Sequence, residues 1–277
     1  MSAPALVLVA HGTRSPAGQA QIRGLTRTVA EHAPELDLHL SYLDVQRPRL
    51  AEVAPRLDRP AVVVPLLLSA GYHVRVDIPN ATAGRDITVT PPLGPDPELV
   101  DVLTGRIAAA GPADAVVLAA AGSSDARSRA DVASVAGALS TPARVGYAST
   151  STPRVSEVIA ELRAEGARRV VVAAYLLGDG IFHRSLRRAG ADAVTAPLVT
   201  SLAIARLVLD RYAAAVAGRS DVARVMWSHR HRDPVAGISC SSSATPRERT
   251  KAWMPDSTCS ATRSPSGSPS GSPTPAW

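Results

Sequence analysis

The sequence predicts an α/β fold made of two similar halves, each a parallel β-sheet flanked by helices. Short aliphatic runs, several of them apolar nearly throughout, are typical of strands buried on both faces of a parallel sheet. These runs alternate with longer amphipathic segments, which is the order of a doubly wound α/β protein. The same motifs also return after about 105 to 110 residues, and a repeat of that length indicates a duplicated domain.

Strands and helices are predicted in alternation from the N-terminus to residue 217. We expect strands in the apolar runs at residues 5–10, 36–43, 61–68, 86–90, 114–120, 143–148, 168–177 and 192–196. We expect helices in the amphipathic segments at residues 18–33, 49–57, 96–110, 125–139, 154–165 and 200–217. Ser15 and Pro16 have the residue types of an N-cap and a first helical position, so the first helix is predicted to begin there.

The internal repeat is visible in three pairs of segments. The sequence "VLVAHG", which contains His11, corresponds to "VLAAAG", which contains Ala121, 110 residues later. The sequence "RPRLAEVAPRL" corresponds to "TPRVSEVIAEL", and "LLSAG" corresponds to "LLGDG". We therefore expect an N-terminal half at residues 1–111 and a degenerate copy of it at residues 112–217.

Residues 218–277 differ from the rest of the chain in composition. All three tryptophans and both cysteines lie there, and the end reads "SPSGSPSGSPTP". A Ser/Pro/Gly tract of this kind cannot bury a core. We expect a low-complexity, disordered tail, which is either a native extension or a frameshifted gene end.

The charge and composition exclude several classes of protein. The net charge of +6 comes mostly from residues 218–277, which carry eight Lys/Arg against four Asp/Glu, while residues 1–217 carry 22 against 20. A nearly neutral core is weak support for nucleic-acid binding, so no nucleic-acid partner is expected. No signal peptide is recognisable, and no apolar run approaches the roughly 20 residues that span a bilayer. We expect a cytoplasmic protein that does not bind a membrane.

Three candidate metal ligands follow three predicted strands of the first half. His11 follows the first strand, Asp44 the second, and His73 the third, in a loop that contains Gly71. The carboxyl ends of parallel strands meet at one edge of a sheet, where ligands bind. Two imidazoles and a carboxylate suit Fe²⁺, Co²⁺, Ni²⁺ or Zn²⁺. Taken singly, His11 could equally be a turn histidine bonded to backbone, and Asp44 a helix N-terminal acid.

The segments that contain these residues resemble a known family. "VAHGTR", "YLDVQRP" and above all "PLLLSAGYHVRVDIP" are similar to the class II chelatases, the sirohydrochlorin chelatase family, over about residues 4–217. The resemblance implies two similar chelatase-like subdomains with a cleft between them. It also implies a lyase that inserts Fe²⁺ or Co²⁺ into sirohydrochlorin, for siroheme or cobalamin biosynthesis. The divalent metal would be a substrate, and no organic cofactor is expected.

The resemblance also assigns roles to individual residues. The metal-binding and catalytic histidines of the family match His11 and His73. The third ligand of the family is usually a glutamate, and Asp44 stands in its place, so the shorter side chain would ligate directly or through water. A neutral imidazole can also accept a pyrrole proton at physiological pH. Arg14, Arg47 and Arg75 are expected to bind the carboxylates of the substrate.

The second half lacks this set of ligands. Ala121, Ser149 and Phe182 stand where the repeat would place His11, Asp44 and His73, and His183 is one position out of register. We expect one catalytic metal per chain, in a monomer or homodimer.

Two other functions remain open from the sequence. A non-enzymatic metal or tetrapyrrole carrier would need the same ligands. A histidine phosphatase would have Arg-His-Gly after its strand, and here Ala10 occupies the place of the arginine.

Overall fold

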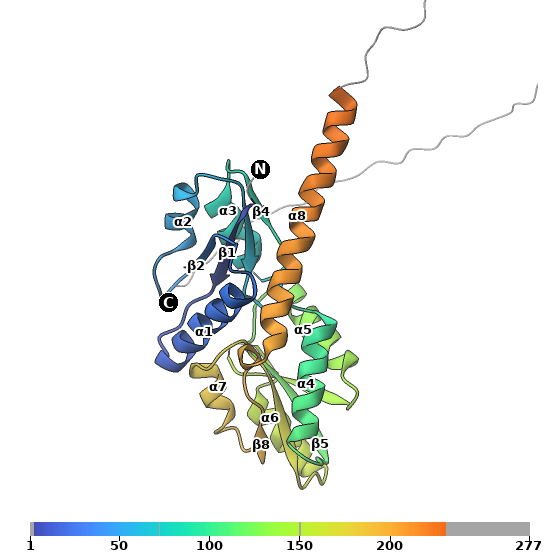
Figure 1. Cartoon of the computed structure of the whole chain (residues 1–277). Coiled ribbons are helices and arrows are strands. Elements are labelled where there is room, and N and C mark those ends of the chain that lie inside the picture. The colour runs from blue at the N-terminus through green and yellow to red at the C-terminus, as the bar shows by residue number, and fades with distance from the viewer. Residues whose placement is uncertain (1–2, 72, 150, 231–277) are drawn as a thin grey trace, which may run out of the picture. The chain divides into compact units, whose positions relative to one another are not determined.

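A computed structural model of the chain describes residues 3–71, 73–149 and 151–230, with side chains described as far as Arg219 (Figure 1). It contains two four-stranded parallel sheets flanked by helices, which confirms the predicted fold class. The strand order is β2-β1-β3-β4 in the first sheet and β6-β5-β7-β8 in the second. The strands are β1 Ala5–Ala10, β2 Leu38–Tyr42, β3 Ala61–Pro65, β4 Ile87–Val89, β5 Ala115–Ala120, β6 Ala143–Tyr147, β7 Val170–Tyr175 and β8 Ala193–Val194.

Helices connect these strands in the predicted order. They are α1 Pro16–His32, α2 Leu50–Val53, α3 Ile78–Thr82, α4 Pro97–Ala109, α5 Ala126–Ala138, α6 Val155–Ala164, α7 Ile181–Leu186 and α8 Leu202–Arg230. Shorter helical turns lie at Ala54–Arg56, His73–Asp77 and Leu198–Thr200. The first helix begins as predicted, because the Ser15 hydroxyl accepts a hydrogen bond from the Gly18 amide at 3.4 Å and Pro16 follows.

The structure differs from the sequence-based expectation in three helical regions. Helix α7, Ile181–Leu186, lies between β7 and β8, where no helix was predicted. His73 begins a π-helical turn that continues into α3, in place of the predicted loop. Elements this short show no amphipathic period that a sequence pattern can reveal.

The last helix continues beyond residue 217, after which the sequence predicts a disordered tail. The Arg219 guanidinium explains part of this extension, because it donates to Thr88 at 2.8 Å and to Asp86 at 2.7 Å, at the edge of the first sheet. Residues 218–230 therefore belong to α8, and residues 231–277 of the predicted tail lie outside the described part of the chain.

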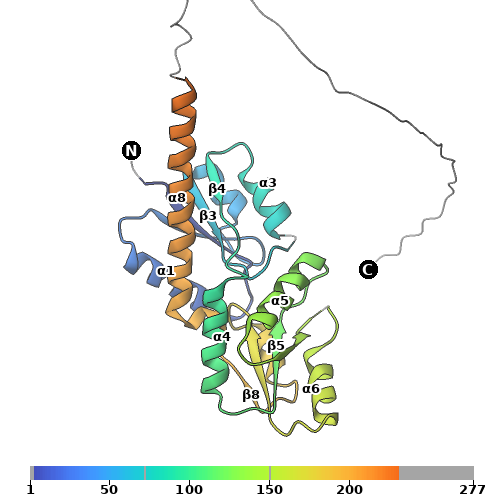
Figure 2. The ribbon, with the colours of Figure 1, turned by 90° about the vertical axis from the view of Figure 1, so that its right-hand side faces the viewer.

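The last helix of each half packs on the sheet of the other half. Helix α4 follows the first sheet in the chain but contacts β7 of the second sheet, and α8 follows the second sheet but contacts β3 and α1 (Figure 2). Both halves accordingly belong to one compact unit. Of the helices in the described residues, none is long and apolar enough to cross a membrane.

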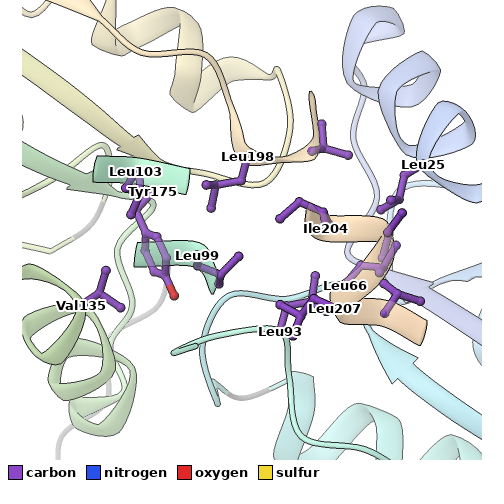
Figure 3. Close-up of a cluster of buried hydrophobic side chains, with 14 of the residues drawn as sticks. Leu25, Leu66, Leu93, Leu99, Leu103, Val135, Tyr175, Leu198, Ile204 and Leu207 are labelled. Atoms are coloured by element: carbon purple, nitrogen blue, oxygen red, sulfur yellow. The ribbon is translucent and has the colours of Figure 1, made fainter. Parts of the chain in front are cut away.

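One hydrophobic cluster joins the two halves. It contains Leu25 of α1, Leu99 of α4, Tyr175 of β7 and Ile204 of α8, all at most 5% exposed, and Figure 3 shows these side chains gathered together. Because neither sheet can bury its inner face without the other half's helix, the halves should lose their structure together.

Substitution of Ile204 by alanine tests this shared core. Ile204 is fully buried, so Ile204→Ala should lower the free energy of unfolding by about 2–5 kcal/mol. Urea unfolding followed by far-UV circular dichroism should still show a single transition. The control is Leu202→Ala on the same helix, because Leu202 is 59% exposed and its loss should change stability by about 0.5 kcal/mol or less. Two separate transitions in the variant would contradict a shared core.

Candidate metal-binding and catalytic site

His11 and His73 lie together at the carboxyl edge of the first sheet. They follow β1 and β3, which are neighbours in the sheet, and their ring centroids are 4.6 Å apart at an interplanar angle of 42°. Residues 62 positions apart in the chain thus form one pair of imidazoles. This is the juxtaposition that the convergence of strand ends predicts.

A backbone hydrogen bond joins the loop after β1 to the loop after β2. The Asp44 amide donates to the His11 carbonyl oxygen at 3.0 Å. Gly12 between them has a φ of 97°, and a Cβ at this position would clash with the Asp44 carbonyl oxygen. Glycine is therefore required directly after His11. It permits the left-handed backbone conformation, and it lets the backbone after β1 approach the backbone after β2 closely.

Side-chain amides hold the same two loops. The Gln46 side chain accepts from the Thr13 amide at 2.9 Å, and the Gln19 side chain donates to the Thr13 carbonyl oxygen at 2.9 Å. Val45 has a φ of 62°, which is rare for a β-branched residue. Strain of this kind, about 1–3 kcal/mol, persists only where surrounding contacts over-determine the backbone. The His11 loop is therefore preorganised before any ligand binds.

Asp44 lies at the same edge but is exposed and pairs with an arginine. Its carboxylate is 3.5 Å from the Arg49 guanidinium. A hydrogen bond from the Val45 backbone, with a smaller contribution from the Arg49 charge, lowers the pKa of Asp44. Across the described residues, no three His, Cys, Asp or Glu side chains are arranged to hold a metal together. The geometry thus brings two of the three predicted ligands into contact, and Asp44 does not complete a three-ligand group with them in the described residues.

Asp77 is a partner of His73 that the sequence analysis did not identify. Its carboxylate lies 2.5 Å from Nδ1 of His73, at a spacing of four residues across the helical turn. A proton held on Nδ1 by the carboxylate places the lone pair of the ring on Nε2, as in many metal-binding histidines. The signal in the sequence is the spacing in "HVRVD", which brings two side chains together only if the segment is helical.

The surroundings of His11 favour its neutral form. Partial loss of hydration, followed by the nearby His73, lowers the pKa of His11. These effects outweigh a backbone hydrogen bond of the His11 ring and the charges of Asp44 and Asp77, all of which act in the opposite direction. A neutral imidazole has a lone pair available for a metal or a proton. His11 is therefore ready for either role at neutral pH.

Two of the three predicted arginine anchors are engaged within the protein. Arg47 forms an ion pair with Glu52, and Arg75 forms one with Asp125 of the second half. Arg14 is exposed, and no ion pair within the described residues involves it. Arg14 is thus the member of the set whose charge is uncompensated.

At the corresponding edge of the second half, two serine hydroxyls form hydrogen bonds to backbone carbonyl oxygens. The Ser149 hydroxyl donates to the Ala121 carbonyl oxygen at 2.6 Å, and the Ser151 hydroxyl donates to that of Ser123 at 2.9 Å. His183 is 1% exposed, and its Nε2 lies 3.0 Å from the Thr195 carbonyl oxygen. His183 therefore lies inside the second half and does not replace a ligand at the edge.

Comparison with known families gives an independent result. The sequence matches the family CbiX twice, over residues 5–110 and 115–215. The two matches coincide with the two halves of the fold, so each half is one copy of the family's repeating unit.

Single relatives and solved structures agree with this match. The sirohydrochlorin cobaltochelatase of Sulfolobus acidocaldarius is 33% identical over 106 residues, which cover 35% of this chain and 85% of the relative. The structure of SirB from Bacillus subtilis with Fe³⁺ has a TM-score of 0.68 at 23% identity and covers 79% of this chain and 98% of that one. A sirohydrochlorin chelatase SirB from Bacillus subtilis subspecies spizizenii, in complex with cobalt, has a TM-score of 0.63 at 20% identity, with coverage of 79% and 97%.

The state of His11 can be measured by NMR titration of its ring protons in metal-free protein. Because the pKa is lowered, the midpoint should lie below the ordinary value of 6.5, and the neutral form should persist into mildly acidic solution. His73→Ala removes a neighbouring charge and opens one side of the ring to water, so the midpoint should move upward. A midpoint at or above 6.5 in the unsubstituted protein would contradict this description of the site.

Proposed function

Because the chain belongs to the CbiX family of sirohydrochlorin chelatases, we propose that it inserts a divalent metal, Fe²⁺ or Co²⁺, into sirohydrochlorin. The observation that carries this proposal is the contact between His11 and His73 at the edge of the first sheet. Two imidazoles are suitable ligands for either metal and leave positions open for other donors. The product would serve siroheme or cobalamin biosynthesis, according to the metal.

Metal insertion requires an exchange of charge at the macrocycle. Two pyrrole protons must leave as the divalent metal enters, so the site must hold the metal first and afterwards accept one proton on an imidazole while the other passes to water. A neutral imidazole performs both tasks in turn, since a ring that has passed its metal to the macrocycle regains a lone pair. The lowered pKa of His11 keeps that ring unprotonated and thus able to bind the metal at the start.

Asp77 would support His73 in the same reaction. Its carboxylate at Nδ1 keeps Nε2 available as a metal ligand and stabilises the imidazolium that forms when Nε2 accepts a proton. Asp44, with its lowered pKa, would remain ionised and contribute negative charge near the incoming cation, directly or through water.

Exposed groups near the His11 loop fit a large anionic macrocycle. Arg14 offers a positive charge three residues after His11. Ile181 and Phe182 on α7 are 68% and 38% exposed, and Gly180 directly before them lies close to Thr13. An apolar surface beside a cation suits a flat ring that carries carboxylates. We assign the macrocycle to this region, with Arg14 as its foremost anchor and Arg47 and Arg75 available only if their ion pairs open.

Alanine substitution of each histidine tests the assignment. His11→Ala and His73→Ala should each lower the rate of Co²⁺ and Fe²⁺ insertion by at least about 100-fold, because each removes a metal ligand and a proton acceptor. The measurement is the change in the visible spectrum of sirohydrochlorin over many turnovers, which also separates an enzyme from a carrier.

The control for these variants is His32→Ala, a histidine at the end of α1 that bonds to the Thr28 carbonyl oxygen. This variant should insert metal at the normal rate. Activity within about tenfold of the unsubstituted protein in either His11→Ala or His73→Ala would refute the site, because removal of a catalytic acid–base group costs more than that.

The number of metals bound per chain tests the role of the second half. Titration of the protein with Co²⁺, followed by its visible absorption, should saturate at about one equivalent, because two imidazoles in one half provide the ligands. His183→Ala should leave this number unchanged and lower the thermal stability, since His183 is buried inside the second half. Two tight equivalents, one of them lost with His183, would contradict the proposal.

A further inference from the structure

The segment that carries His73 is held in place by residues of the second half. We call residues 68–71 and 73–75 the His73 segment. The Tyr175 hydroxyl donates to the Leu68 carbonyl oxygen at 2.8 Å, and the Asp131 carboxylate accepts from the Ala70 amide at 3.1 Å. Two further contacts come from α5 and its N-cap: Ser128 with Ser69 at 2.7 Å, and Asp125 with Arg75.

These contacts matter because the backbone of the His73 segment is irregular. Strand β3 ends at Pro65, and backbone hydrogen bonds to the rest of the first half continue through Leu66 and Leu67. Among the described residues, Leu68 to Gly71 make no backbone hydrogen bond to another strand. The position of an irregular segment depends on side chains that satisfy its backbone groups. For the Leu68 carbonyl and the Ala70 amide those side chains come from the other half of the chain.

Equivalent contacts occur a second time, with the roles of the two halves exchanged. We call this second copy the mirrored contact. The Gln21 side chain of α1 accepts from the Asp179 amide at 2.6 Å, and Arg184 donates to the Ser15 hydroxyl at 3.0 Å. In the repeat, Gln21 corresponds to Asp131, and Asp179 corresponds to Ala70. Each half thus docks the loop after its third strand on the first helix of the other half.

The two copies of this contact differ in what they hold. The copy built on α5 holds the segment that leads to His73, whereas the copy built on α1 holds the segment that leads to Phe182. The acceptor also differs, since Asp131 offers a charged carboxylate where Gln21 offers a neutral amide. The charged contact at Asp131 is 3.1 Å long and the neutral contact at Gln21 is 2.6 Å long, so the two copies differ in acceptor charge and in the segment that they hold.

We propose that Asp131, supported by Ser128, is a positioning residue that holds His73 in contact with His11. The second half, which lacks ligands of its own, therefore contributes to the site by anchoring the His73 segment. This inference rests on the proposed function for its kinetic consequence, but its structural consequence is measurable without turnover. Asp131 touches neither metal nor macrocycle and acts through the Ala70 amide.

The test compares three variants in the full chain. Asp131→Ala removes the acceptor, and Asp131→Asn retains a carbonyl acceptor of the same shape. Gln21→Ala breaks the mirrored contact, which holds neither His11 nor His73. Misplacement of a catalytic group by about 1 Å can cost 100-fold in rate. Asp131→Ala should therefore lower kcat by at least about tenfold with KM for sirohydrochlorin changed by about twofold or less.

The conservative variant and the mirrored control should behave differently. Asp131→Asn should recover kcat to within about threefold, because the Ala70 amide keeps its partner. Gln21→Ala should leave kcat and the Co²⁺ spectrum unchanged even where its melting temperature falls as far as that of Asp131→Ala. Any effect on activity should fall on KM for sirohydrochlorin, because Gln21 holds the segment that leads to Phe182. If Asp131→Ala does not fold, Ser128→Ala, which removes only the hydroxyl that meets Ser69, should lower kcat in the same direction.

A second measurement keeps the inference separate from the proposed function. The visible spectrum of bound Co²⁺ and the NMR signals of the His73 ring report the geometry of the imidazole pair whether or not metal is inserted. Both should change in Asp131→Ala and remain normal in Gln21→Ala. An unchanged Co²⁺ spectrum with normal kcat in Asp131→Ala would overturn the inference, as would an equal loss in Gln21→Ala. Loss of insertion by the unsubstituted protein would instead refute the proposed function.

Discussion

Each half of this chain is completed by elements of the other half, and the rest of the structure depends on that exchange. A parallel sheet must be covered on both faces. Here α4 covers part of the second sheet and α8 covers part of the first. The loops after the third strands are exchanged in the same way, through Asp131 in one direction and Gln21 in the other. The duplicated halves are thus joined by their cores and by their loops.

The geometry of the site follows from this architecture in two steps. The parallel sheet brings the ends of β1 and β3 to one edge, which places His11 and His73 within reach of each other. Local contacts then set their orientation: Gly12 permits the close approach to the Asp44 backbone, and Asp77 orients the His73 ring. The result is a pair of imidazoles held by backbone contacts and a paired carboxylate, which is the kind of preorganisation that the proposed metal site requires.

Duplication has given the two halves different tasks. The first half keeps the histidines, and the second has small residues at the equivalent edge, where Ser149 and Ser151 bond to the backbone. These hydrogen bonds satisfy the Ala121 and Ser123 carbonyl oxygens within the protein, so these groups need no bound ligand as a partner. Phe182 and Ile181 remain exposed on α7, so the second half still offers an apolar surface and an anchor for the His73 segment.

The sequence by itself determined the strands, the long helices, the duplication and the pair His11 and His73. These features depend on local patterns: aliphatic runs that need burial on both faces, and polar residues at the ends of parallel strands, which must share an edge. The sequence also placed Asp44 at that edge, but its ion pair with Arg49 depends on side-chain geometry.

Only the tertiary structure decided which partners these residues have. The burial of His183, the pairing of Arg75 with Asp125 and the contact of Asp131 with Ala70 join segments that no local pattern connects. Asp77 reaches His73 because the segment between them is helical, a conformation too short to show a period in the sequence. A local pattern records which face of an element is apolar, whereas a contact between distant segments depends on how the whole chain packs.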